Sequence, residues 1–470
     1  MLEKVVDVAE TEFERHVTRL QRYIRQPSVS AEKRGNEEMA AMLAADIDAL
    51  GGVGKVVPGV DFPIVYGRFD VGAERTVLIH GMYDTQIAGE PEWVVDPFEA
   101  VRMDFEDFGE CIVGRGAEDT KGPIAATFGM IESYKLADVP LPVNLILLFE
   151  ASELGSASLP PFVEAHVEEL RDADVAYWPW HSGHANGEAV AWLGCKGLMF
   201  FDLTVRSDAW GGPSQEIHGM QTGWIGNPAH RLVQALASLR TPDDLKMTVD
   251  GYYGAGDPMT EDDRMLIKRL AQRLDPKTIL KNLGAQRFKQ DSFEAALTEH
   301  CFGSEFNIDG IRAGHVIEDG HKVNICQEAV ASMDLRPLPG MSVEQVTAAL
   351  RRHFDSHGFP EVEIKVKSGY LGGRLPLRHW AVQELLGAYG DCGFDPEIWP
   401  RTATAIGADL FMNTVGIPWL ASCPGHAGRK HGPNEYVQLS GFGKAVPFIC
   451  RLIWRLAHAK GMPPRVASER

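Results

Sequence analysis

Five short clusters of this sequence are rich in carboxylate and histidine side chains, and each lies after or beside an apolar run. Carboxylate oxygens and neutral imidazole nitrogens are the ligands that hold a borderline divalent metal at about 2 Å. One such cluster alone is more often a turn or a cap, but several that converge predict a metal centre. The clusters are HGMYD (80–84), GRGAEDTKGP (114–123), FEASELGS (149–156), WPWHSGH (178–184) and RKHGPNE (429–435).

The elements that must position these clusters have the pattern of buried strands. Apolar runs occupy 64–69, 76–81, 143–150 and 175–178, and residues 123–134 between two of them have a helical period. Buried strands that alternate with helices predict an α/β sheet covered on both faces. Ligands of such sheets gather beyond the carboxyl ends of the strands, where the clusters lie.

The N-terminal segment has a helical period as well. Residues 3–25 are predicted as one amphipathic helix, and Glu37–Leu50 as a second that ends at Gly51-Gly52. The segment contains no apolar stretch of signal-peptide length, and no part of the chain has the roughly 20 apolar residues of a membrane span. We therefore expect a cytoplasmic protein.

The pattern changes from about Leu198. Strands with one polar face are predicted at 198–207, 323–337 and 362–369, and helices lie between them. Such a pattern predicts a small α+β domain whose sheet has helices on one face. We expect residues 197–370 to form this inserted domain, and residues 1–196 plus 371–470 to form the catalytic domain.

Composition narrows the functional classes. The 470 residues include 65 acidic and 46 basic side chains, which gives a formal net charge of -19. A field of that sign repels phosphate backbones and anionic membranes, so neither is expected as a partner. The seven cysteines form no CxxC pair, which favours reduced thiols over a disulfide framework or a thiolate metal site.

Taken together and in this order, the motifs resemble those of the aminoacylase/carnosine-dipeptidase/succinyl-diaminopimelate desuccinylase family of zinc peptidases. The resemblance includes EEMAAMLAADIDALGG, PEWVVDPFEAV, GRGAEDTKGP, GYYGAGDPMTEDDR, FNIDGIRAG, SMDLRPLPG and HGPNE, and it runs over nearly the whole chain. The carnosine-dipeptidase branch is the most similar. This implies an α/β phosphorylase/hydrolase-like catalytic domain with an inserted ferredoxin-like α+β lid that dimerises.

The resemblance also implies roles for single residues. Asp119 matches the carboxylate that bridges two metals, while Glu153 and His431 match the private ligands of one of them. His218, in QEIHGM, falls where the family places a lid histidine that reaches the partner subunit's site and polarises the scissile carbonyl.

Three further positions are expected to bind substrate. Asn307 in FNIDG and Arg336 in DLRPLPG match lid residues of the family, and Arg336 would hold a carboxylate through a bidentate contact. The alternative for Arg336 is a surface ion pair. Arg401 opens RTATA, where the family has Arg-Glu-Gly-Gly-Ser, so the glycine-rich loop after it has gained side chains.

Two departures from the family pattern concern the other metal. Met82 stands where the family has a ligand histidine, and Trp180 falls at about the place of a ligand aspartate. A thioether is a poor ligand for zinc or manganese. The sequence therefore predicts one divalent metal, Zn or Mn, held by Asp119, Glu153 and His431.

The general base is also changed. The family has two adjacent carboxylates before x-Gly-Ser, whereas this chain has Glu150-Ala151-Ser152-Glu153. Ser152 takes the position of the base unless the shorter loop brings Glu150 in. A metal-bound water needs a proton acceptor within about 3 Å, and Glu150 is the candidate.

Three functions follow as alternatives. The first is a hydrolase of a C–N bond, an amide or an amine on an activated ring, in a small carboxylate-bearing substrate. The second is a two-metal dipeptidase or deacylase in which His80 or His181 replaces the lost ligands. The third is an inactive binding relative, which the retention of His218 and Arg336 disfavours. A homodimer or higher homo-oligomer is expected, because the family's lid histidine acts in trans.

Overall fold

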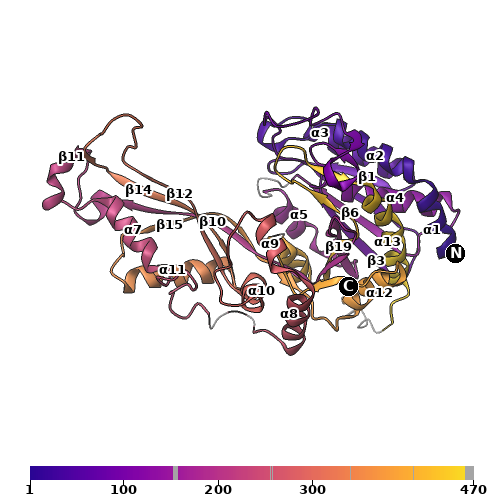
Figure 1. The fold of residues 1–470 in the computed structure, drawn as a ribbon. Coiled ribbons are helices and arrows are strands. Elements are labelled where there is room, and N and C mark those ends of the chain that lie inside the picture. The colour runs from indigo at the N-terminus through magenta and orange to yellow at the C-terminus, as the bar shows by residue number, and fades with distance from the viewer. Residues whose placement is uncertain (152–156, 254–255, 257, 339, 406, 461–470) are drawn as a thin grey trace. The chain divides into compact units, whose positions relative to one another are not determined.

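The computed structural model describes residues 1–151, 157–253, 256, 258–338, 340–405 and 407–460 (Figure 1). The chain divides into two compact units: unit 1 comprises Met1–Gly194, Arg374–Trp399 and Leu410–Arg470, and unit 2 comprises Cys195–Gly373 and Pro400–Asp409. The predicted insertion lies within unit 2. Residues 400–409 also belong to unit 2, whereas the sequence analysis placed them in the catalytic domain.

An eight-stranded sheet forms the centre of unit 1, in the order β1-β2-β6-β3-β7-β19-β8-β17. The strands β6, β3, β7 and β19 are parallel neighbours, and every residue of β7 is buried. Burial on both faces explains why these strands read as continuous apolar runs. The bounds are β1 Val53–Val57, β2 Ile64–Phe69, β3 Thr76–Met82, β6 Asn144–Glu150, β7 Val175–His181, β8 Val190–Trp192, β17 Glu397–Trp399 and β19 Trp419–Cys423.

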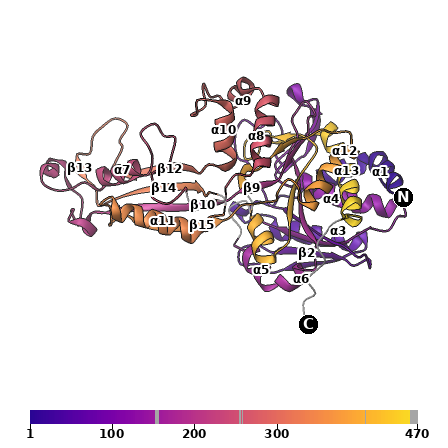
Figure 2. The ribbon, with the colours of Figure 1, turned by 90° about the horizontal axis from the view of Figure 1, so that it is seen from below.

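Helices cover both faces of this sheet. Helices α4 and α13 lie on one side, and α5 and α6 lie on the other (Figure 2). Helix α4 is buried along most of its length because the sheet, α1, α2 and α13 surround it. The bounds are α3 Asn36–Leu50, α4 Lys121–Leu136, α5 Leu159–Ala165, α6 Val167–Leu170, α12 Trp380–Asp391 and α13 Leu439–Ala457.

The N-terminal segment forms two helices, so the prediction of one helix over 3–25 is wrong. Helix α1 spans Leu2–Thr11 and α2 spans Phe13–Arg25, with Glu12 at φ -87° and ψ 19° between them. Thr11 Oγ1 donates to Asp7 O at 2.7 Å, and a side chain that bonds the preceding turn favours a bend.

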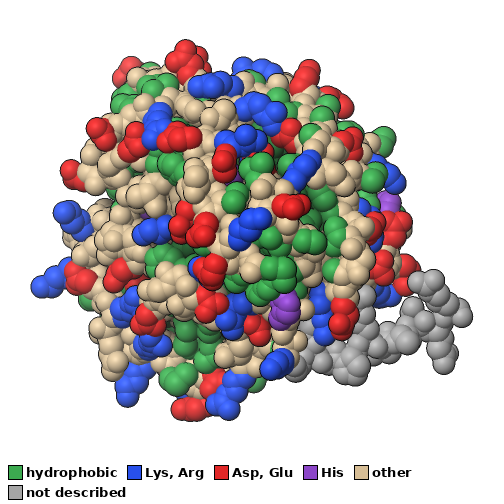
Figure 3. Space-filling model, turned by 90° about the vertical axis from the view of Figure 1, so that its right-hand side faces the viewer, with side chains coloured by type: hydrophobic (Ala, Val, Ile, Leu, Met, Phe, Trp, Pro, Cys, Tyr) green, Lys and Arg blue, Asp and Glu red, His purple; other side chains and the backbone are tan. Residues whose placement is uncertain are grey.

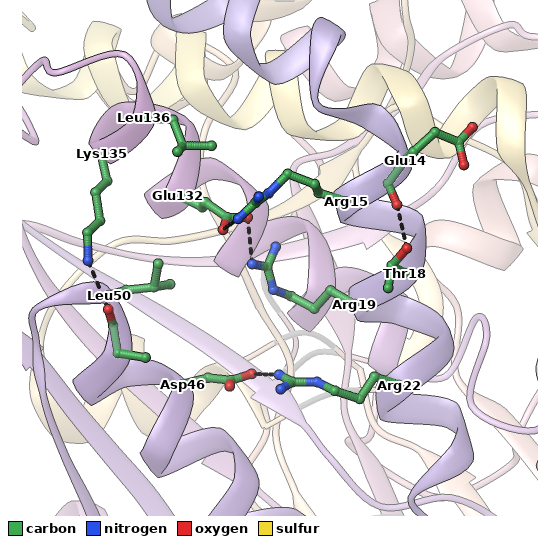
Figure 4. A pocket seen from close by; sticks show the side chains of 11 residues that line it. Glu14, Arg15, Thr18, Arg19, Arg22, Asp46, Leu50, Glu132, Lys135 and Leu136 are labelled. Carbon is green, nitrogen blue, oxygen red and sulfur yellow. Dashed lines mark hydrogen bonds and ion pairs between the residues drawn. The ribbon is translucent and has the colours of Figure 1, made fainter.

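A groove of about 730 Å³ lies where α2, α3 and α4 meet (Figure 4). Its charged side chains pair across the helices. Glu132 of α4 accepts from Arg15 and Arg19 of α2, each at 2.6 Å, and Arg22 of α2 pairs with Asp46 of α3. The ion pairs thus connect α2 to both neighbouring helices.

A second sheet of unit 1 has the order β20-β21-β5-β4. Its central pair, β5 (Glu110–Val113) and β21 (Tyr436–Gln438), is antiparallel and joins Val113 to Tyr436. The outer strands are β4 (Val101–Asp104) and β20 (Ala427–Gly428).

Unit 2 contains a four-stranded antiparallel sheet in the order β12-β14-β10-β15. Alternate residues of β10 and β14 are buried under α7 and α11, which gives the one-sided pattern seen in the sequence. The bounds are β10 Leu198–Arg206, β12 Glu305–Ala313, β14 Glu328–Arg336, β15 Glu363–Tyr370, α7 Pro228–Ser238 and α11 Val343–Ser356.

Unit 2 also carries smaller elements. The segment after Asp250 contains α8 (Glu261–Arg273), α9 (Pro276–Asn282) and α10 (Phe293–Phe302). Strand β18 (Thr402–Ala405) pairs in parallel with β9 (Gly194–Lys196), through Thr402 with Cys195 and Ala405 with Lys196. A two-residue ladder joins β11 (Ile217–His218) to β13 (Asn324–Ile325).

Acidic and basic side chains are interspersed over the face in Figure 3. Among the described residues, no helix has the length and apolar character needed to cross a membrane.

Candidate metal centre

Two loops that are far apart in the sequence meet because β5 and β21 pair. The loop 114–120 follows β5, and the loop 429–435 precedes β21, so the antiparallel pairing of Val113 with Tyr436 places both loops at one end of the ladder. The first loop carries Asp119 and the second carries His431.

Asp119 and His431 lie side by side. His431 Nε2 is 3.1 Å from Asp119 Oδ2, and Asp119 Oδ1 is buried with no hydrogen-bond partner in the part of the chain that the structure describes. The Asp119 side chain is 7% exposed, whereas that of His431 is 55% exposed. A buried carboxylate oxygen with no partner next to an accessible imidazole nitrogen is a donor set that fits a divalent cation.

The third predicted ligand, Glu153, lies outside the described residues, as does Ser152. Within the part of the chain that the structure describes, no group of three or more histidine, cysteine, aspartate and glutamate side chains is arranged to hold a metal ion. Of the three predicted ligands, the structure therefore describes two, Asp119 and His431.

The two residues that the sequence analysis expected in place of family ligands each contact one of these loops. The Met82 amide donates to Thr120 Oγ1 at 3.2 Å, and that hydroxyl donates to Met82 O. Lys430 Nζ is 4.9 Å from the centre of the Trp180 ring. Met82 therefore lies beside the Asp119 loop through its backbone, and Trp180 lies beside the His431 loop through its ring; neither side chain is a good metal ligand.

His80 is engaged elsewhere. Its Nε2 is 2.9 Å from Glu150 Oε1, both side chains are 3% exposed, and their strands β3 and β6 are parallel neighbours. The rings of Trp178 and Phe411 lie 5.7 Å and 5.1 Å from the imidazole. Glu150 Oε2 is buried and has no hydrogen-bond partner among the described residues. One oxygen of the predicted base is thus held and the other remains free to accept.

His181 is buried at the end of β7, and neither ring nitrogen has a hydrogen-bond partner within the described ranges. Gly122 and Gly425 leave room for the ring, because a Cβ would lie 3.1 Å from its Cε1 and 2.9 Å from its Cδ2 respectively. Burial lowers the pKa of His181 to about 4, so the ring is neutral.

The sequence analysis missed several buried charged residues around Asp119, among them Arg115, Lys121 and Glu435. Arg115 Nη1 donates to Glu435 Oε2 at 2.9 Å, and each side chain is 1% exposed. Lys121 Nζ donates to Tyr23 O and Gln26 O at 3.0 Å and 2.6 Å. Burial lowers the pKa of Lys121 to about 7 and raises that of Glu435. These residues lie within two of the polar clusters that the sequence analysis singled out, GRGAEDTKGP and RKHGPNE, and that position could have identified them.

Unit 2 contains the other predicted residues. His218 is exposed on β11, and its Nδ1 accepts from the Met220 amide at 3.1 Å. Asn307 Nδ2 donates to Asp309 Oδ1 and Asp334 Oδ2 at 2.8 Å and 2.9 Å.

Arg336 and Arg401 also lie in unit 2. Arg336 Nε is 3.0 Å from Glu305 Oε2, and its Nη1 donates to Ala403 O. Arg401 is 3% exposed, and its guanidinium lies 5.3 Å from the Phe302 ring. In this structure Arg336 forms the ion pair that the sequence analysis held as its alternative role.

Residues 78–455 match the sequence profile of Peptidase family M20/M25/M40. The chain belongs to this family. A Cys-Gly metallodipeptidase of Schizosaccharomyces pombe is 28% identical over 507 residues, 97% of this chain and 98% of that protein. The human Beta-Ala-His dipeptidase is 25% identical over 376 residues, 76% of this chain and 71% of that protein.

Solved structures of the family have the same fold. An M20 family metallo-carboxypeptidase from Sulfolobus solfataricus superposes with a TM-score of 0.84 and 25% identity, over 94% of this chain and 99% of the other. Human carnosine dipeptidase 1 superposes with a TM-score of 0.75 and 22% identity, over 97% and 100%.

Membership of the M20 family confirms three expectations. The resemblance to the carnosine-dipeptidase branch is correct, and the fold is that of an M20 peptidase with a catalytic domain and a lid domain. The chain is a metal-dependent hydrolase of C–N bonds.

Proposed function

We propose that this M20 hydrolase cleaves a C–N bond in a small carboxylate-bearing substrate, and that it does so with one divalent metal held by Asp119, Glu153 and His431. The observation that carries the proposal is the Asp119–His431 pair, with 3.1 Å between Nε2 and Oδ2 and a free buried oxygen on Asp119. Zn or Mn suits this donor set. Short peptides are the first substrates to test, because two relatives are named dipeptidases.

A divalent cation in this site would supply Lewis-acid chemistry, polarising the scissile carbonyl and lowering the pKa of a water. The chain's own groups complete the reaction. Glu150 accepts the proton of the attacking water through Oε2, while His80 holds Oε1 and so fixes the carboxyl group. His218 from the partner subunit stabilises the charge that develops on the carbonyl oxygen. Asn307, Arg336 and Arg401 bind the substrate.

A second candidate, the two-metal dipeptidase, has one observation in its favour. Both ring nitrogens of His181 are buried without hydrogen-bond partners, and the ring is neutral, as a ligand must be. His80 favours the one-metal proposal instead, because its Nε2 is already bonded to Glu150. The presence of Met82 and Trp180 where the family has metal ligands also favours the one-metal proposal.

Metal analysis separates the two candidates. Elemental analysis of the purified protein and titration with Zn²⁺ and Mn²⁺ should give about one equivalent per chain. Asp119→Asn should abolish that binding and the hydrolysis of dipeptides, N-acyl amino acids or aminoaromatic acids, whichever is cleaved. Asp46→Asn, an ion-paired carboxylate on α3, serves as the control and should change neither. Two equivalents, with loss of one in His181→Gln, would establish the two-metal dipeptidase.

A further inference from the structure

The carboxyl group of Glu435 hydrogen-bonds directly to the backbone of the Asp119 loop. Its Oε1 accepts from the amides of Glu118 and Asp119 at 2.8 Å and 2.9 Å. Its Oε2 accepts from Arg115 Nη1 at 2.9 Å. The side chain is 1% exposed, so these contacts satisfy it inside the protein.

Glu435 belongs at the same time to the loop that carries His431, four residues earlier. Its own backbone carbonyl accepts from the Gly114 amide at 2.8 Å. One residue therefore binds the Asp119 loop through its side chain and through its main chain. A displacement of either loop would change the separation of Asp119 Oδ2 from His431 Nε2.

The His431 loop needs such anchoring. His431 and Asn434 both have φ of 61°, a left-handed conformation that non-glycine residues adopt at a cost. Asn434 offsets this cost by accepting from the Val94 amide at 2.7 Å and donating to Glu92 O at 2.8 Å. Glu435 then ties the end of the loop to residues 114–119.

Arg115 extends the connection to a third segment. Its Nη2 donates to Ile87 O at 3.0 Å, and its guanidinium lies 5.3 Å from the centre of the Trp93 ring. The Arg115–Glu435 pair is thus the point at which residues 87–94, 114–119 and 431–435 meet. Groups beyond the ligands that fix ligand geometry commonly change metal affinity 10- to 100-fold when they are replaced.

We infer that Glu435, held by Arg115, is a positioning residue that sets the distance between Asp119 and His431 and so determines the affinity of the metal site. The inference rests on the proposed function, because it presupposes that these two residues bind a metal. It assigns Glu435 no contact with the ion or the substrate. Its effect is transmitted through the amides of Glu118 and Asp119.

The test is Zn²⁺ and Co²⁺ affinity of the full-length chain, measured by competition with a chromophoric chelator. Glu435→Gln should raise the dissociation constant about 10- to 100-fold, because its amide nitrogen cannot accept from Arg115. The visible absorption of the Co²⁺-substituted protein should also change, since it reports the geometry of the ligands. Thermal denaturation of the metal-free protein gives the accompanying loss of stability.

Glu132→Gln is the matched control, because Glu132 is also a largely buried glutamate of unit 1 that accepts from two donors, those of the exposed Arg15 and the partly buried Arg19. It should lower the melting temperature and leave the dissociation constant and the Co²⁺ spectrum unchanged. If Glu435→Gln does not fold because Arg115 is left unpaired, Arg115→Met/Glu435→Gln removes the buried charge and should show the same weakened affinity.

Two outcomes would contradict the inference, and they differ in what else they contradict. Wild-type affinity and spectrum in Glu435→Gln, or in the double variant, would show that Glu435 is merely structural while the metal site stands. Absence of metal binding in the wild-type chain would overturn the proposed metal site and, with it, the positioning role.

Discussion

At the scale of single residues, the site differs from a plain cluster of ligands in how few of its groups are free. His80 and Glu150 engage each other, and Arg115 and Glu435 form a buried pair. Asp119 Oδ1 and Glu150 Oε2 are among the described atoms nearby that have no hydrogen-bond partner. These two oxygens are the ones to which the proposed function assigns metal binding and proton transfer.

Glu150→Gln tests the second assignment. We expect kcat to fall about 100-fold or more, because an amide cannot accept the proton of the attacking water. Metal content should stay that of the wild type. Glu397→Gln is the control, since Glu397 is another buried glutamate of unit 1 that pairs with a histidine, His184 Nε2, at 3.0 Å. Equal kcat in the two variants would leave Glu150 as no more than the partner of His80.

At the scale of elements, the sequence predicted most of the catalytic sheet and the sheet of the lid. A strand buried on one face alternates apolar and polar residues, and a strand buried on both faces is apolar throughout, so both kinds are visible in the sequence. Helix α3 ends at Gly51, which has φ of 99°, as the Gly-Gly signal indicated. The break at Glu12 was missed, since neither glycine nor proline marks it and the apolar period continues through it.

The pairing of residues could not be read from the period. His80 and Glu150 meet because β6 lies between β2 and β3, and an order of strands is a property of the whole sheet. Asp119 and His431, 312 positions apart, could be joined in advance only through the family resemblance. The sequence therefore predicted which residues carry the chemistry better than which of them touch.

Helix α2 provides a test of packing at this scale through His16. The imidazole is buried against α4, where a Cβ on Gly129 would lie 2.9 Å from Nδ1, and Nε2 donates to Ala9 O at 3.2 Å. Nδ1 has no hydrogen-bond partner, so a second proton there would find no acceptor. Burial lowers the pKa of His16 from 6.5 to about 4.

The sign of the pH dependence follows from this shift. The unfolded chain binds the proton near pH 6.5 and the folded chain only near pH 4, so the stability from neutral His16 is complete above 6.5 and lost as the pH falls between these values. The loss amounts to about 3 kcal/mol. Urea denaturation in EDTA should show a shallower decline for His16→Gln than for the wild type. His458→Gln, on an exposed residue, should decline as the wild type does; parallel curves for all three would contradict the role of His16.

At the scale of the whole molecule, the expectation of a dimer remains a prediction that concerns His218. The residue is exposed on β11 of unit 2. Two apolar side chains close to it in sequence are also largely exposed, Met220 at 75% and Trp224 at 80%. Exposed apolar side chains gathered at one place commonly mark a contact surface, and a second copy of the chain would cover them.

A mixed dimer tests whether His218 acts on the partner's site. Asp119→Asn and His218→Ala chains, each inactive as a homodimer, are co-expressed with different tags and the heterodimer is purified through both. If His218 acts in trans, one site carries both substitutions and the other carries neither, so the heterodimer should have about half the wild-type activity.

The control pairs Asp119→Asn with Glu153→Gln. Both changes fall on the same proposed ligand set, so each site of that heterodimer carries one defect and it should be inactive. An inactive Asp119→Asn/His218→Ala heterodimer would place His218 at the site of its own chain. A monomer by light scattering, with full activity, would remove the need for a partner, and His218 would then have to reach Asp119 within one copy.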